Sequence, residues 1–233
     1  MRITLDTGKD PMGTAIAEYY AKGRAARLRV FSSQFYEDEI PVDTLFRTLE
    51  DMPPQEQEAL RLCRGRVLDV GAGSGCHSLE LMNRGMDVMA IDISTLSVDV
   101  MKQRGIDARV VDFFDKTFDE KFDTILMAMN GIGIVGRIER LPEFFMRLKQ
   151  ILAPGGQVLL DFMSSRTRTV PSTSTLPVPI MARLTTACNT AASRENPSTG
   201  STSTLTPSPC MPMSMASCAR SALTESTTTI WQD

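Results

Sequence analysis

The sequence predicts an α/β fold, a doubly wound and mostly parallel sheet that follows an N-terminal helical region. Between residues 66 and 161, short apolar runs alternate with stretches of helical period, which is typical of parallel strands joined by crossover helices. The first apolar run leads into three glycines at alternate positions, where the backbone can turn sharply at the end of a strand. With 233 residues, 42% of them apolar, the chain is long enough for one ordinary domain and a tail.

We expect residues 1–62 to form a helical cap. Gly13 and Pro41 interrupt its helical segments, and Pro53-Pro54 is placed to begin a helix that Gly65 ends. We interpret the basic run at 22–29 as a solvated helix face, because acids follow at 37–39. Four aromatic residues are candidate walls of a ligand pocket, although aromatic residues at such spacing more often serve packing: Tyr19, Tyr20, Phe35 and Tyr36.

The α/β core is predicted at residues 63–163. Its helices are indicated by apolar periods that end near Gly85 and Gly105, and by a third period over 141–152. The connections between these elements are short, as a parallel sheet requires. The predicted strands are 66–70, 87–91, 108–111, 124–129 and 157–161.

The clearest motif is Asp69-Val-Gly71-Ala-Gly73-Ser-Gly75 at the end of the first predicted strand. A dinucleotide-binding turn of the form GxGxxG or GxGxxA would need Gly or Ala at position 76, which is Cys76. The carboxylate of Asp69 would repel a pyrophosphate but would attract a sulfonium or an amino group. The spacing therefore argues against a nicotinamide oxidoreductase.

These residues resemble the first motif of the class I S-adenosylmethionine-dependent methyltransferases, an acid followed by GxGxG. The resemblance implies a Rossmann-like sheet and S-adenosyl-L-methionine as cofactor. It also implies that the loop lies against the methionine part of the cofactor. The residues to which it gives this role are Asp69, Gly71, Ala72, Gly73 and Gly75.

The resemblance continues along the chain to residue 161. Asp92 and Ile93 end the second strand, where a carboxylate can accept both ribose hydroxyls. Asp112 and Phe113 end the third strand, where the family places the adenine ring. The sequences 122–126 and 152–156 resemble its fourth strand and the turn before its fifth.

Asn130, after the fourth strand, is the residue expected nearest the methyl acceptor. Enzymes that methylate amino groups of nucleic acids usually read (D/N)PP(Y/F) here, whereas Asn130 is followed by Gly131 and Ile132. Residues 1–163 also hold more acids than bases, 25 against 20. Both observations favour a small-molecule acceptor over nucleic acid, although Asn-Gly is also a turn sequence on its own.

No catalytic residue is assigned from the sequence. His77, the one histidine, is a candidate general base because its ordinary pKa is near neutral, but local packing explains a histidine there as well. An alcohol acceptor would need a base, and a thiolate or free amine would not. The alternative function is a protein that binds S-adenosylmethionine without turnover, its activity lost with an aberrant C-terminus at residues 164–233.

We expect a cytoplasmic protein with free thiols, no metal and no membrane span. The first residues lack a signal-peptide pattern, and no apolar stretch is long enough to cross a bilayer. The five cysteines form no CxxC pair, so neither a zinc site nor a disulfide framework is indicated.

Residues 164–233 differ in composition from the rest of the chain. Half are Ser, Thr or Pro, lysine is absent, and Trp231 is the one aromatic residue. We predict that this segment is disordered, and that it is not the natural continuation of the domain, because the family's sheet continues after the fifth strand with an antiparallel hairpin. Translation in a shifted reading frame would give such a change, and a genuine disordered tail is the alternative.

Overall fold

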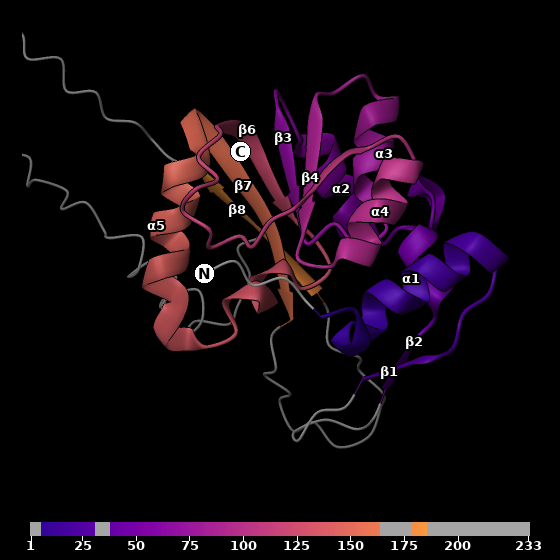
Figure 1. Cartoon of the computed structure of the whole chain (residues 1–233). Coiled ribbons are helices and arrows are strands. Elements are labelled where there is room, and N and C mark those ends of the chain that lie inside the picture. Colours follow the sequence, from indigo (N-terminus) through magenta and orange to yellow (C-terminus); the bar gives the residue numbers. More distant parts are fainter. Residues whose placement is uncertain (1–5, 31–37, 164–178, 186–233) are drawn as a thin grey trace, which may run out of the picture. The chain divides into compact units, whose positions relative to one another are not determined.

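A computed structural model describes residues 6–30, 38–163 and 179–185, all within the compact unit Met1–Thr186. Its main sheet has six strands in the order β5-β4-β3-β6-β7-β8 (Figure 1). The first five are parallel, and β8 is antiparallel to β7. This confirms the predicted α/β class. The strands are β3 (Val67–Val70), β4 (Val88–Asp92), β5 (Asp107–Val110), β6 (Phe122–Met127), β7 (Leu152–Met163) and β8 (Pro179–Thr185).

The three predicted crossover helices are present. They are α3 (Cys76–Asn83), α4 (Thr95–Gln103) and α5 (Leu141–Ile151). Figure 1 shows α5 on one side of the sheet and α3 and α4 on the other, which is the doubly wound arrangement. Phe144, Leu148 and Ile151 of α5 are buried, because their spacing places them on one helix face.

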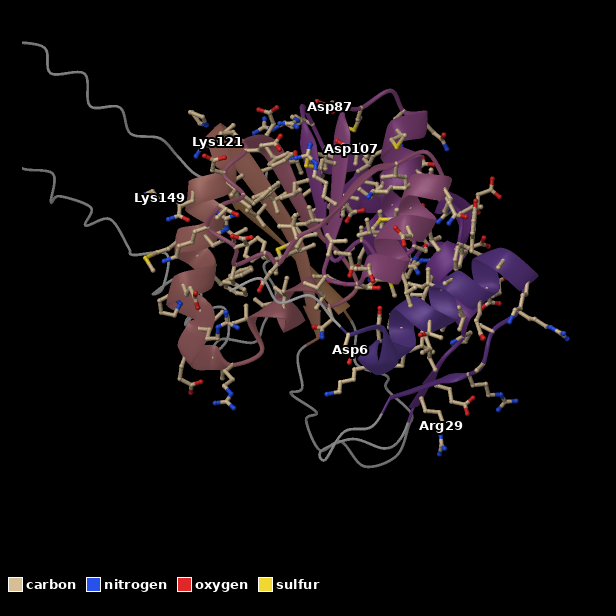
Figure 2. The ribbon with its side chains drawn as sticks, in the orientation of Figure 1. Asp6, Arg29, Asp87, Asp107, Lys121 and Lys149 are labelled. Atoms are coloured by element: carbon tan, nitrogen blue, oxygen red, sulfur yellow. The ribbon has the colours of Figure 1, made fainter. Side chains whose placement is uncertain are left out.

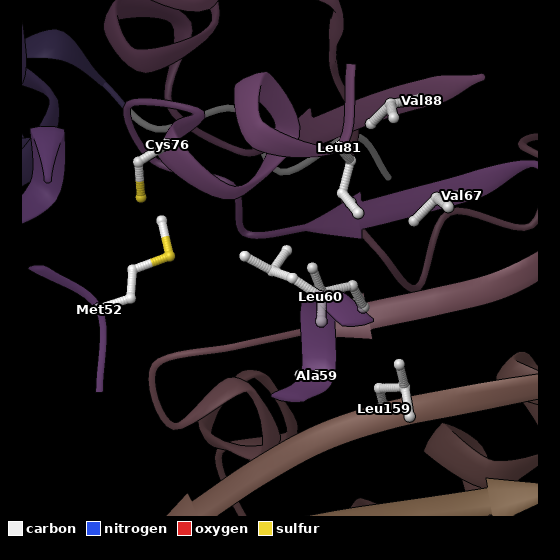
Figure 3. Packing of buried hydrophobic residues seen from close by; sticks show 9 residues of the cluster. Met52, Ala59, Leu60, Val67, Cys76, Leu81, Val88 and Leu159 are labelled. Carbon is white, nitrogen blue, oxygen red and sulfur yellow. The ribbon is translucent and has the colours of Figure 1, made fainter. Parts of the chain in front are cut away.

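A fourth helix, α2 (Pro54–Leu62), covers the core beside α3. It begins with Pro54 at its first position, where the missing proline N–H disrupts no helical hydrogen bond. Figure 3 shows Leu60 of α2 in one cluster with Val67 of β3 and Leu81 of α3. All three side chains are 1% exposed or less, so this helix belongs to the core of the fold.

The sequence predicted a helical N-terminal region, but the structure shows that this region also contains strands. Its elements are η1 (Thr7–Lys9), α1 (Pro11–Lys22), β1 (Leu28–Val30), β2 (Asp38–Ile40), η2 (Val42–Phe46) and η3 (Leu49–Asp51). β1 and β2 form an antiparallel pair, and α1 ends at Gly23 in the left-handed conformation. The predicted helix face at 22–29 is therefore wrong, because Gly23 ends the helix and the chain then becomes extended.

A buried carboxylate joins this region to the core. Asp10, 4% exposed, caps α1 by accepting a hydrogen bond from the N–H of Gly13 at 2.8 Å. Ser94, which caps α4, donates its hydroxyl to the same Asp10. The Asp10 carboxylate thus accepts hydrogen bonds at the amino ends of both α1 and α4 and connects the two helices.

The segment after residue 163 contains a strand that the sequence did not predict. Residues 179–185 pair with 157–163 of β7 in an unbroken antiparallel register. The prediction that 164–233 holds no regular structure is therefore wrong for β8, because the Ser-, Thr- and Pro-rich composition of the whole segment hides a short, mostly apolar run at 179–185. Residues 164–178 and 186–233 lie outside the described residues.

A network of charges occupies the amino ends of the strands. Arg66 lies 3.3 Å from Asp87 and 2.7 Å from Glu120 in ion-pair contacts, and Arg109 contacts Glu120 as well. Figure 2 shows Asp87 at this edge together with Asp107. In a parallel sheet, ligands bind at the opposite, carboxyl edge, so this network is separate from the site described next.

Candidate functional site

The glycine loop, residues 71–75, connects β3 to α3 at the carboxyl edge of the sheet. Gly71, Gly73 and Gly75 have φ angles of 69°, 58° and 80°, a region that residues with a Cβ rarely adopt. A Cβ on Gly71 would meet nothing within 4 Å, and one on Gly73 would have its nearest neighbour at 3.8 Å. A Cβ on Gly75 would lie 2.3 Å from Cδ1 of Ile106. The first two glycines therefore face open space that a ligand can enter, and the third permits close packing.

Asp92 lies beside this loop at the end of β4. Its Oδ2 accepts a hydrogen bond from the N–H of Gly73 at 3.0 Å, and its Oδ1 accepts one from the N–H of Ser94 at 2.9 Å. Burial raises the pKa of Asp92, and these N–H groups act in the opposite direction. Each oxygen retains a lone pair for a ligand hydroxyl. Ile93 is half-buried beside it, whereas Ala72 is buried in the core.

Asp69 supports the loop from below. Its side chain is in the core, with 2% of the residue exposed, and its Oδ2 accepts a hydrogen bond from the hydroxyl of Ser78 at 2.6 Å. Burial raises the pKa of Asp69, while the nearby His77 acts to lower it. This position links β3 to α3. The role of Asp69 in orienting a cofactor stays a prediction.

The third strand end holds Asp112 and Phe113. The carboxylate of Asp112 accepts a hydrogen bond from the N–H of Phe114 at 2.9 Å, and the residue is half-buried. Phe113 is 1% exposed and packs against Phe114 and Phe144, with ring centroids 5.3 and 5.4 Å apart. The structure therefore gives Phe113 a packing role, and its contact with an adenine ring stays a prediction.

The turn after β6 contains Asn130, which is exposed. The N–H of the next residue, Gly131, donates to Oδ1 of Asp161 at 3.0 Å. Because β3 and β6 are neighbours in the sheet, this turn and the glycine loop follow adjacent strand ends. The strand order reverses at this pair, and in open α/β sheets ligands bind at such a reversal.

Comparisons with known proteins agree with this arrangement. Residues 67–156 match the model of a methyltransferase domain family. A crystal structure of an S-adenosylmethionine-dependent methyltransferase from Bacteroides fragilis, in complex with S-adenosyl-L-homocysteine, has 57% sequence identity and a TM-score of 0.67, and the match covers 70% of this chain and 68% of that one. This chain belongs to the S-adenosylmethionine-dependent methyltransferases.

Curated methyltransferases are more distant relatives. A cypemycin N-terminal methyltransferase from Streptomyces sp is 34% identical over 99 residues, which are 41% of this chain and 40% of that protein. A ubiquinone biosynthesis O-methyltransferase from Dechloromonas aromatica is 27% identical over 127 residues, 51% of this chain and 55% of that protein. The chain thus spans about half, or less, of the length of these relatives.

Below the glycine loop, this methyltransferase has a buried chain of charges that the sequence did not reveal. Oε2 of Glu56 lies 2.8 Å from Nε2 of His77 and also contacts Nη2 of Arg47. All three side chains are 10% exposed or less. Burial acts to raise the pKa of Glu56, but His77 and Arg47 lower it below its usual value.

The same contacts decide the protonation of His77. Burial acts to lower its pKa, but the contacts with Cys76 and Glu56 raise the pKa to about 10. Nε2 of His77 faces Glu56, and its Nδ1 lies 3.7 Å from Sγ of Cys76, so both ring nitrogens have partners within the protein. His77 therefore joins α3 to α2, and this pairing argues against the role of general base that the sequence had left open.

Sequence reasoning missed Glu56, Arg47 and Asp161 for one shared reason. Arg47 and His77, which contact Glu56, lie 9 and 21 positions from it in the sequence, and Asp161 lies 30 positions from its partner Gly131. No local sequence pattern encodes pairs so far apart. The proline pair before α2 is the one signal, because it fixes where that helix begins and so places Glu56 in its first turn.

The aromatic residues of the N-terminal region are only partly described. Tyr19 stacks on Phe46 with centroids 4.9 Å apart, and Tyr20 is 41% exposed. Phe35 and Tyr36 lie outside the described residues. The predicted pocket walls thus include one packing residue, Tyr19, and one exposed residue, Tyr20.

In the described part of the chain, no group of three or more His, Cys, Asp or Glu side chains is arranged to hold a metal ion. Among the same residues, no helix is long and apolar enough to cross a membrane. Cys63 and Cys76 are free thiols there. The cytoplasmic location stays a prediction.

Proposed function

We propose that this chain binds S-adenosyl-L-methionine at the carboxyl edge of β3, β4 and β6 and transfers its methyl group to a small-molecule acceptor. The observation that carries the proposal is the bond between Gly73 N and Asp92 Oδ2, 3.0 Å long. It joins a loop of open glycines to a carboxylate that still has lone pairs for a ligand. The Bacteroides fragilis relative, described in complex with S-adenosyl-L-homocysteine, supports the choice of cofactor.

The chain offers complementary groups for each part of this cofactor. Gly71 and Gly73 leave room for the methionine part, and Asp92 can accept the ribose hydroxyls. Asp112 is available on the adenine side.

When bound, the cofactor supplies a methyl group already activated by a sulfonium. The protein therefore has to hold the acceptor in line with the methyl–sulfur bond and to keep water out. It needs no covalent nucleophile of its own. Because both ring nitrogens of His77 are engaged by protein groups, an acceptor that loses a proton would give it to another group or to solvent.

A small-molecule acceptor is supported by the absence of a (D/N)PP(Y/F) motif at residue 130 and by the excess of acids in residues 1–163. Acidic surfaces do not attract polyanions. The names of two relatives, a cypemycin N-terminal and a ubiquinone biosynthesis O-methyltransferase, specify a peptide terminus and an oxygen acceptor for those proteins. They leave both nitrogen and oxygen acceptors to be tested here.

Two measurements test the proposal. In calorimetric titrations, we expect S-adenosylmethionine and S-adenosylhomocysteine to bind and NAD not to bind. In a methyl-release assay over a panel of amines, phenols, alcohols and thiols, we expect turnover with at least one class. Binding of NAD alone would reject the cofactor, and binding without any turnover would reject the transfer step.

A further inference from the structure

The backbone immediately after β6 is in an unfavourable conformation. Met129 and Asn130 have φ angles of 56° and 62°, and they are the only non-glycine residues with positive φ in the described part of the chain. Asparagine tolerates this region, but methionine rarely adopts it. Such a conformation persists where the surrounding structure imposes it, and it is concentrated at functional sites.

Asp161, near the end of the neighbouring strand β7, contacts this turn. Its carboxylate is buried, with 5% of the residue exposed. Oδ1 accepts the N–H of Gly131 at 3.0 Å, and the N–H of Asn130 also donates to this carboxylate. Two adjacent backbone donors can reach one carboxylate because the chain turns here, so the bonds and the left-handed turn depend on each other.

The turn is held closely against the sheet as well. A Cβ on Gly131 would lie 2.6 Å from Cβ of Met127, so only glycine fits between the turn and the strand end. The N–H of Gly133 then donates to the carbonyl of Asn130 at 2.8 Å and closes the first turn of η4 (Gly131–Val135). The backbone is thus fixed on both sides of residue 130.

The position of this turn gives it a role in the proposed site. β6 lies between β3, which leads into the glycine loop, and β7, which ends at the Asp161 region. Asp92 lies on the far side of β3, at the end of β4. The strand order reverses between β3 and β6, so the turn after β6 lies on one side of the reversal and Asp92, the proposed ribose ligand, on the other. Met129 and Asn130 are exposed, whereas Asp161 is buried.

We propose that Asp161 is a positioning residue that holds the Met129–Asn130 turn in its left-handed conformation, so that the turn forms the wall of the site on the acceptor side. The role as an acceptor wall rests on the proposed function. The holding of the turn does not, and it can be tested in the absence of any ligand.

The first test is amide hydrogen exchange on the full chain, read for residues 128–136. We expect Asp161→Ala to speed exchange in this segment at least tenfold, and Asp161→Asn, which keeps one acceptor oxygen, to have a smaller effect. Asp123→Asn is the matched control, because Asp123 also accepts a backbone N–H, that of Arg66 at 2.8 Å, but at the other end of β6. Unchanged exchange in both Asp161 variants would overturn the proposal, and Asp161→Asn decides the matter if the alanine variant does not fold.

A second background separates holding the turn from general support of the fold. Met129→Gly removes the steric strain at the left-handed residue that adopts this conformation least readily. We expect the effect of Asp161→Ala on exchange in 128–136 to be at least threefold smaller in the Met129→Gly chain than in the unaltered one. Equal effects in both chains would show that Asp161 does not act through this turn.

The link to the site is tested with S-adenosylhomocysteine as the probe. We expect it to slow exchange in both the glycine loop and residues 128–136 of the unaltered chain. Slowing in the glycine loop alone would show that the turn is not part of the site. If the probe slows neither segment and gives no binding heat, the proposed function fails, while the exchange of the Asp161 variants still decides whether this residue holds the turn.

Discussion

His77 illustrates how the surroundings of a residue determine its chemistry. Its imidazole contacts the side chains of Glu56 and Cys76. It also interacts electrostatically with the carboxyl groups of Asp69 and Asp161. The contacts with Cys76 and Glu56, together with the charge of Asp69, raise the pKa of this buried imidazole and outweigh the desolvation that acts to lower it. The ion pair with Glu56 fixes the distance between α2 and α3, directly beneath the glycine loop.

We predict that this pair makes the stability of the protein depend on pH. The folded-state pKa of His77, about 10, lies above its ordinary value of 6.5, so its contribution is complete below pH 6.5 and is lost as the pH rises toward 10. The pKa of Glu56 is lowered from 4.5, so its contribution is complete above pH 4.5 and is lost in more acidic solution. His77 is the one histidine of the chain, so its imidazole NMR signals are unambiguous.

These signals should stay constant from pH 6 to 8 and should change only near pH 10. The melting temperature should fall over the range from 6.5 to 10, and His77→Gln should remove this dependence. The variant should also lose about 3 to 5 kcal/mol of stability, because it leaves Glu56 with one cation fewer in a buried site. A titration near pH 6.5 would contradict the assignment of a charged pair.

Asp92 is the residue for which the strongest binding effect is expected. We predict that Asp92→Ala weakens the binding of S-adenosylhomocysteine by about 2 to 4 kcal/mol, because two hydrogen bonds from the ribose hydroxyls to a charged acceptor are lost. Asp92→Asn should lose less, since one oxygen remains. The control is Asp99→Ala on the exposed face of α4, which should bind as the unaltered chain does. Calorimetric affinities of folded variants measure both effects, and unchanged affinity in Asp92→Ala would refute the ribose role.

At the scale of single residues, the sequence predicted the positions that follow strand ends and missed those defined by tertiary contact. Asp92 was predictable because a strand pattern ends there. Glu56 and Asp161 were not, because their roles depend on which elements become neighbours in space. The packing role of Phe113 was hidden for the same reason, since Phe144, its partner, belongs to α5.

At the scale of an element, the glycine loop combines two functions that the sequence motif does not separate. Gly71 and Gly73 leave open space, whereas Gly75 lets Ile106 approach α3. The sequence predicted the core strands and helices because each is bounded by turn residues. It missed β1 and β2, which are only three residues long, too short for an alternating pattern to be distinguished from chance.

We predict that Gly73→Val abolishes binding of S-adenosylhomocysteine and leaves the fold intact. The new side chain would enter the open space beside Asp92, and its left-handed backbone should destabilise the chain by only about 1 to 2 kcal/mol. Gly85→Val is the matched control, because Gly85 has a φ of 79° and also open space around it, but it ends α3 away from the loop. Circular dichroism and calorimetry on both variants are the measurements, and retained binding in Gly73→Val would show that no ligand approaches this glycine.

Gly75→Ala should have the opposite pattern. Its Cβ would lie 2.3 Å from Ile106 and 3.0 Å from Met101, so we predict a loss of stability of about 1 to 3 kcal/mol from overpacking, in addition to backbone strain. The variant should still bind S-adenosylhomocysteine under conditions in which it is folded. Loss of binding in a chain with unchanged melting temperature would instead place the ligand against Gly75.

At the scale of the whole molecule, the chain changes character after residue 163. Half of the residues after this point are Ser, Thr or Pro, and lysine is absent from them. The match to the Bacteroides fragilis methyltransferase covers 70% of this chain, so part of the chain lies outside it. The strand β8 supplies seven residues beside β7, so an edge partner exists, but its sequence lies within the Ser-, Thr- and Pro-rich segment.

We predict that residues after about 163 come from a shifted reading frame, and that the coding DNA read in one of the other two frames beyond codon 161 contains alternating apolar strands and a hairpin. The reason is the abrupt change of composition, in which lysine disappears and half of the residues become Ser, Thr or Pro. A chain restored in that frame should bind S-adenosylhomocysteine more tightly and melt more cooperatively than the present chain. If neither frame encodes such a pattern, the segment is a genuine tail, and the present chain should then match the binding and melting behaviour of an intact methyltransferase.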